Sequence, residues 1–94
     1  MIWLPTHDAE YHEWLAKNGG GFVINSDKAL KSSSYPMIHR ATCDHINDVG
    51  TPNYTTGPYF KLCALNKEEL DYWVQQIDKR ELKACKDCAP NAGK

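Results

Sequence analysis

Residues 85–90 read Cys85-Lys86-Asp87-Cys88-Ala89-Pro90, which places two cysteines with two residues between them just before a proline. A Cys-x2-Cys pair of this kind is typical of a knuckle that supplies two ligands to a tetrahedral metal ion. A second pair lies upstream, where three residues separate His39 from Cys43. Zinc prefers four nitrogen or sulfur ligands, and a site closed by four side chains is usually structural. The sequence therefore predicts one structural zinc ion bound by His39, Cys43, Cys85 and Cys88.

The four cysteines also allow other interpretations. An even number of cysteines in a short chain is compatible with disulfides, and unligated thiols often pack as small apolar residues. The first residues, Met1 to Pro5, contain neither a basic region nor an apolar run of the kind found in secretory signals. We therefore expect a cytoplasmic protein, in which a Cys-x2-Cys pair is more often a metal or redox pair than a disulfide.

Two other residues compete with His39 for the fourth ligand position. Cys63 falls in a predicted strand just before a helix, where a small apolar residue is expected to pack into the core. His45 is so close to Cys43 in sequence that joint chelation would be strained. We therefore prefer His39.

The order of these elements resembles a known family. The pattern H-x3-C, a strand, a helix and C-x2-C-x-Pro, from His39 to Pro90, is similar to the small zinc domain of the Ada DNA-repair protein and to Ada-like modules appended to nucleases. The resemblance implies a metal-stapled fold and work on DNA, in a repair, restriction or phage context. In that family a zinc-bound cysteine accepts a methyl group. The corresponding residue here is His39, and because a thiolate is the nucleophile in that reaction, we expect no alkyl transfer.

A second resemblance rests on two apolar stretches. Gly21-Phe22-Val23-Ile24-Asn25, followed later by Ile38-His39-Arg40-Ala41, is similar to uncharacterised small proteins of bacteria and phages. This resemblance implies no particular activity.

Length and composition limit the possible architectures. The chain has 94 residues, of which 41% are hydrophobic and 24% charged. We expect one zinc-stabilised domain over residues 1–90 and a disordered tail over 91–94, because a core of this size gains much from a metal. The net charge of −1 excludes a uniformly basic nucleic-acid binder, and no apolar run is long enough to predict a membrane partner.

The first half of the chain predicts a helix and two strands. Residues 6–18 have helical spacing of apolar residues, with Thr6 or Asp8 as the N-cap. Residues 22–24 form a short apolar strand. Residues 35–40 form a second strand, which Pro36 places at a sheet edge or at the strand start. We expect these two strands to pair in antiparallel fashion.

The second half predicts a strand followed by a helix. Residues 59–64 alternate, with Phe60 and Leu62 on one face. Asn66 and Glu69 have the spacing of a capping box. The helix that follows repeats apolar residues on one face, at Leu70, Trp73, Val74 and Ile77. The predicted fold is thus α+β: a short antiparallel sheet with two amphipathic helices, stapled by a structural zinc.

Two classes of function fit this fold. The first is nucleic-acid binding, through a face composed of Arg40, Lys61, Tyr59 and Asn25. There a cation lies beside a ring that can stack on a base. The alternative for these residues is a solvated Lys61 and an Arg40 paired with Asp44. The second class is a protein-interaction module, because five Tyr, three Trp and two Phe can supply anchors.

We predict that the chain is not an enzyme. A zinc ion with four protein ligands has no open position for a reacting water. Candidates for a hydrolytic site are His7, His12, His39, His45, Asp8, Asp44 and Asp48, of which Asp44, His45 and Asp48 are the most suggestive. Histidines and aspartates in a turn-rich loop, however, are usually capping or solvated residues.

Overall fold

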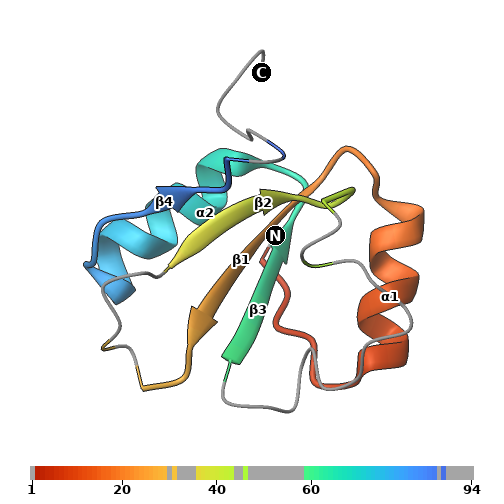
Figure 1. The fold of residues 1–94 in the computed structure, drawn as a ribbon, viewed down its shortest axis with the longest axis horizontal. Coiled ribbons are helices and arrows are strands. Elements are labelled where there is room, and N and C mark those ends of the chain that lie inside the picture. The colour runs from red at the N-terminus through yellow and green to blue at the C-terminus, as the bar shows by residue number, and fades with distance from the viewer. Residues whose placement is uncertain are drawn as a thin grey trace.

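A computed structural model describes residues 2–29, 31, 36–43, 46, 59–86 and 88 of the 94-residue chain. Within these residues the elements are α1 (Asp8–Lys17), β1 (Phe22–Asp27), β2 (Met37–Arg40), β3 (Tyr59–Ala64), α2 (Lys67–Trp73), the π-helical turn η1 (Val74–Asp78) and β4 (Lys83–Ala84). The fold is α+β, as predicted (Figure 1). Among the helices of this described part, none is both long and apolar enough to cross a membrane.

The sheet has the order β3-β1-β2-β4 and is mixed. β1 pairs in antiparallel fashion with β2, as predicted, and also with β3. β4 pairs in parallel with β2, so the prediction of a purely antiparallel sheet is wrong. The physical reason is the path of the chain, which crosses over through α2 and η1 and returns in the direction of β2. This parallel return brings Cys85, directly after β4, next to His39.

Each face of the sheet is covered by one helix (Figure 1). Because side chains alternate along a strand, Val23 and Cys63 face α1, whereas Ile24 and Leu62 face α2. Tyr11 and Leu15 of α1 pack on the first face. Leu70 and Val74 pack on the second face. The two faces thus form two separate apolar clusters, and His39 lies on the α1 side because it pairs with Val23.

The ends of α1 differ slightly from the prediction. The helix starts at Asp8, and its N-cap is His7, whose side chain makes no capping hydrogen bond. Thr6 and Asp8 are therefore not the cap. After the helix, Gly21 passes close to Trp14, and a Cβ atom there would lie 2.8 Å from the Trp14 ring and 3.0 Å from the Ala64 carbonyl oxygen. Only glycine fits this crossing without displacing backbone.

The helix after β3 begins where the sequence predicts, with Asn66 as its N-cap, although the Asn66 side chain makes no capping hydrogen bond. Leu70 and Val74 are buried as predicted. Ile77 is 60% exposed, so its predicted place on the buried face is wrong. The reason is that residues Val74–Asp78 are π-helical, and the wider turn shifts Ile77 out of register with the apolar stripe.

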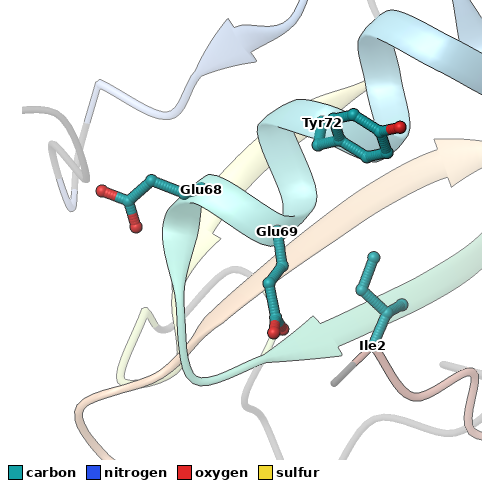
Figure 2. A pocket seen from close by; sticks show the side chains of 4 residues that line it. All are labelled: Ile2, Glu68, Glu69 and Tyr72. Atoms are coloured by element: carbon teal, nitrogen blue, oxygen red, sulfur yellow. The ribbon is translucent and has the colours of Figure 1, made fainter.

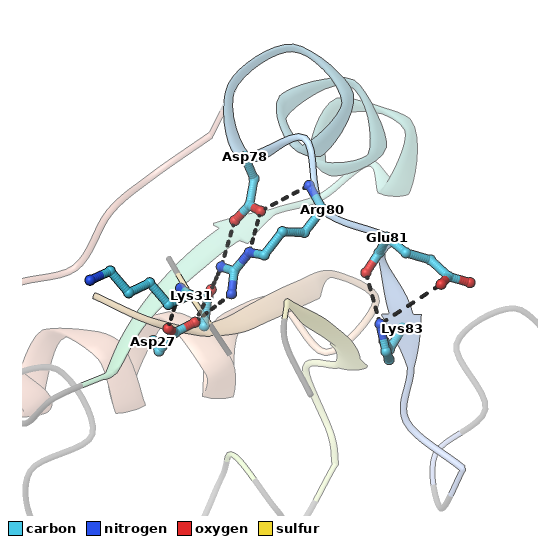
Figure 3. Close-up of polar contacts among 7 residues, drawn as sticks. Asp27, Lys31, Asp78, Arg80, Glu81 and Lys83 are labelled. Atoms are coloured by element: carbon cyan, nitrogen blue, oxygen red, sulfur yellow. Dashed lines mark hydrogen bonds and ion pairs between the residues drawn. The ribbon is translucent and has the colours of Figure 1, made fainter. Parts of the chain in front are cut away.

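Arg80 anchors the end of η1 to the end of β1 (Figure 3). Its Nε donates to Asp78 Oδ1 at 2.6 Å, and its Nη1 donates to Asp27 Oδ1 at 2.7 Å. Its Nη2 donates to the buried Ser26 hydroxyl at 2.7 Å. These bonds stabilise the charged guanidinium and so raise the pKa of Arg80 above its usual value, chiefly through Asp78. The network sets the position from which the chain turns into β4.

We predict that Arg80→Met lowers the free energy of unfolding by about 2–3 kcal/mol, because the buried Asp78 carboxylate loses its charged partner. Lys83→Met is the matched control. Its contact with Glu81, at 4.0 Å, is exposed and is expected to contribute less than about 0.5 kcal/mol. Urea unfolding of both variants tests this, and equal stability of the two would contradict the anchoring role.

Candidate metal centre

Two segments of the chain supply the predicted ligands. His39 lies in β2, and the chain then turns so that the Cys43 amide donates to the Arg40 carbonyl oxygen at 3.0 Å. On the other segment, the Cys85 amide donates to the Ile38 carbonyl oxygen at 3.0 Å and continues the parallel pairing of β4 with β2. Cys88 follows three residues later, at the spacing of the Cys-x2-Cys pair.

The structure places all four predicted ligands in one cluster. The ligand atoms of His39, Cys43, Cys85 and Cys88 all lie within 4.8 Å of one another. Cys43 Sγ lies 3.5 Å from His39 Nδ1 and 3.8 Å from Cys85 Sγ. Cys88 is half-buried and the other three are buried. This cluster can hold a metal ion. Among the His, Cys, Asp and Glu side chains of the described residues, these four lie close enough together to bind one ion.

The cysteines are free thiols, so the disulfide interpretation does not apply to this structure. Cys63, one rival for the fourth ligand, is fully buried between β1 and Trp3, outside the cluster. Burial raises the pKa of the Cys63 thiol to about 12, so it is held as a neutral thiol that packs as an apolar residue. His45, the other rival, lies outside the described residues.

Arg40 holds the knuckle that carries Cys88. The Arg40 amide donates to Cys88 Sγ at 3.2 Å, and the Arg40 Nε donates to the Cys88 carbonyl oxygen at 2.8 Å. The guanidinium is therefore engaged with the backbone of the knuckle, which was not anticipated in either interpretation of Arg40 from the sequence. Asp44, the ion-pair partner considered there, lies outside the described residues.

Lys61 is buried, with 4% of its surface exposed, so the alternative of a solvated lysine is wrong, and this burial does not support the predicted binding role. Its Nζ donates to Asn25 Oδ1 at 2.9 Å. Tyr59 lies on the same face of β3 but is 39% exposed. The structure therefore does not support the nucleic-acid surface predicted from these four residues, since Lys61 and Asn25 are hydrogen-bonded to each other.

Three of the residues considered for a hydrolytic site, His7, Asp8 and His12, lie at the start of α1 or within it. His7 is exposed and lies 3.8 Å from Glu10 on the same helix. His12 is half-buried against the Tyr11 ring, with a centroid distance of 5.4 Å. Asp44, His45 and Asp48 lie outside the described residues.

No protein-family model, no curated protein and no solved structure matches this chain. The resemblance to the Ada zinc domain therefore stays a prediction. What the structure itself defines is an α+β domain with a candidate metal centre of one histidine and three cysteines.

Burial lowers the pKa of Lys61 to about 8. A lysine with a lowered native pKa binds its proton less tightly in the folded state than in the unfolded state, so stability rises with pH between about 8 and the unfolded pKa of about 10.5. We predict that wild type gains about 1–2 kcal/mol relative to Lys61→Met between pH 7 and pH 9.5, in paired urea titrations. A constant difference between the two proteins across this range would contradict a buried, titrating Lys61.

Proposed function

We propose that this chain is a small zinc module, in which one Zn²⁺ bound by His39, Cys43, Cys85 and Cys88 joins β2 to the C-terminal knuckle. The observation that carries the proposal is the convergence of four nitrogen and sulfur ligands from two distant segments within 4.8 Å. Three thiolates and one imidazole form a donor set that suits zinc, which binds sulfur and nitrogen in tetrahedral sites.

The separations in the cluster support a tetrahedral ion. With zinc–sulfur bonds of about 2.3 Å and zinc–nitrogen bonds of about 2.0–2.1 Å, a tetrahedron requires about 3.8 Å between two sulfurs and about 3.6 Å between sulfur and nitrogen. Cys43 Sγ lies 3.8 Å from Cys85 Sγ and 3.5 Å from His39 Nδ1. These two edges match the size of a zinc site, with His39 binding through Nδ1, and the remaining edges lie within 4.8 Å.

We propose a structural rather than a catalytic metal. Four protein ligands close the coordination sphere, and a catalytic zinc keeps one position for water or substrate. Structural zinc contributes about 10–16 kcal/mol of apparent binding energy in small finger peptides, which is comparable with the whole stability of a typical domain, about 5–15 kcal/mol. The ion would therefore supply a large part of the stability of this domain.

We do not extend the proposal to nucleic-acid binding on the face that the sequence suggested. Lys61 is buried and Arg40 is bonded to the Cys88 carbonyl oxygen. A buried lysine is not available to a phosphate backbone, and phosphate contacts supply most of the affinity of such complexes.

We predict one zinc ion per chain. Cys85→Ser should lose the metal and most of the cooperative unfolding transition, whereas Cys63→Ser should keep the metal and lose about 1–2 kcal/mol of stability. Elemental analysis of the purified variants, followed by urea unfolding with and without a chelator, measures both effects. Full zinc stoichiometry in Cys85→Ser would refute the ligand assignment.

We also predict that Arg40→Met weakens zinc binding by about 10-fold or more, because groups that orient metal ligands typically affect affinity on this scale. The hydrogen bond from the Arg40 backbone amide to Cys88 Sγ remains in this variant. Any loss of zinc affinity therefore reports the guanidinium contact with the knuckle. Lys86→Met is the matched control, since it removes an exposed cation of the same knuckle. Competition with a chromophoric chelator measures both affinities, and equal affinities would leave Arg40 without a positioning role.

A further inference from the structure

The face of the sheet that carries α2 also carries an apolar groove with acidic residues. Ile2, Glu68, Glu69 and Tyr72 line this groove, which has a volume of about 480 Å³ and which we call the Ile2–Tyr72 groove. Figure 2 shows Glu69 and Tyr72 on the side of α2 that faces Ile2, with Glu68 at the start of the helix. The groove is on the opposite face of the sheet from His39, so its properties do not depend on the details of the metal centre.

The helix presents more apolar surface here than its packing requires. Its core side buries Leu70 and Val74. Tyr72 nevertheless keeps 66% of its surface exposed, and Leu65, in the bend between β3 and α2, keeps 61%. Within α2, Glu68 and Glu69 lie four and three residues before Tyr72, so both are its neighbours on the helix surface. Aromatic side chains exposed beside an apolar groove are typical anchors for a partner protein.

Charge determines which kind of partner fits. Lys67, the one basic residue of α2, is paired with Asp71 at 2.9 Å and does not line the groove. Glu68 and Glu69 are the charged groups of that lining. Carboxylates repel phosphate and anionic lipid and attract lysine and arginine, which favours a basic partner.

We propose that the Ile2–Tyr72 groove is a docking site for a basic segment of a partner protein. One large apolar side chain of this segment inserts between Ile2 and Tyr72, and flanking Lys or Arg side chains face Glu68 and Glu69. This is the recognition of an amphipathic segment by an apolar groove, with the orientation and specificity set by charge at the rim.

Two fluorescein-labelled synthetic peptides with the same leucine and tyrosine positions test the proposal. In one peptide every polar position is lysine, and in the other it is glutamate. Fluorescence anisotropy with the full metal-loaded chain should show saturable binding of the lysine peptide, with a Kd below about 1 mM. The glutamate peptide should bind at least about 10-fold more weakly. Amide NMR shifts caused by the lysine peptide should centre on Ile2 and residues 68–72.

Substitutions in the groove identify the anchors. Tyr72→Ser should weaken binding of the lysine peptide about 5-fold or more, since truncation of a central aromatic anchor commonly has effects of this size. Glu68→Gln combined with Glu69→Gln should reduce the dependence of binding on salt. The matched controls lie outside the groove lining: Ile77→Ser removes an equally exposed apolar side chain, and Glu81→Gln removes an exposed carboxylate.

Both controls should change the affinity less than about 2-fold. The proposal is overturned if the two peptides bind equally, if the lysine peptide does not saturate, or if the controls weaken binding as much as the groove variants. Zinc content measured on the same samples separates this result from the metal assignment, because a chain that holds zinc but binds no peptide refutes the docking site alone.

Discussion

The meeting of two ligand pairs from distant parts of the sequence is the constraint on which this structure depends. His39 and Cys43 lie on one side of residues 44–84, and Cys85 and Cys88 lie on the other. Their ligand atoms nevertheless lie within 4.8 Å of one another. β3, α2 and η1 must therefore fold between the two pairs before all four side chains can meet. A metal that closes a loop stabilises the folded state most when the loop is long, because the closure removes much of the conformational entropy of the unfolded chain.

Several contacts outside the cluster help to bring the two ligand pairs together. The Arg80 network ties η1 to β1 and directs the chain into β4, and the parallel pairing of β4 with β2 places Cys85 beside His39. The Cys88 knuckle is then held by the amide and guanidinium of Arg40. Mutually supporting contacts of this kind are a property of sequences that specify a single structure. The metal centre thus depends on contacts made by residues that are not themselves ligands.

Local signals predicted much of this fold from the sequence. β3 has the predicted bounds, because alternation and flanking turn residues both mark it. The four candidate ligands were identifiable because ligand spacing is a local pattern. The parallel β4 was not predictable in the same way. It has two residues, too few to show a period, and its pairing depends on the crossover through α2. The prediction that Ile77 is buried was wrong because it assumed an α-helical period through residues Val74–Asp78. These residues form a π-helical turn, for which the sequence has no recognisable pattern.

The burial of Lys61 was the largest departure from the sequence-based analysis. Lysine is almost never fully buried without a partner, so a surface position was the sound expectation. One partner is Asn25, which lies in a different strand and becomes a neighbour only through the register of β1 with β3. Partnerships of this kind are tertiary, and the same is true of the Arg40 contact with Cys88. Both cations therefore changed from candidate binding residues to structural ones once the strands were placed.

X-ray absorption at the zinc edge of the purified protein tests the central claim most directly, because it reports the atoms bonded to the metal. Our account predicts three sulfur ligands at about 2.3 Å and one nitrogen at about 2.0–2.1 Å, with the nitrogen lost in His39→Ala. A first shell of four sulfurs would place Cys63 in the site, and a shell with two nitrogens or with oxygen would require a different ligand set. Either result would contradict the His39, Cys43, Cys85 and Cys88 centre.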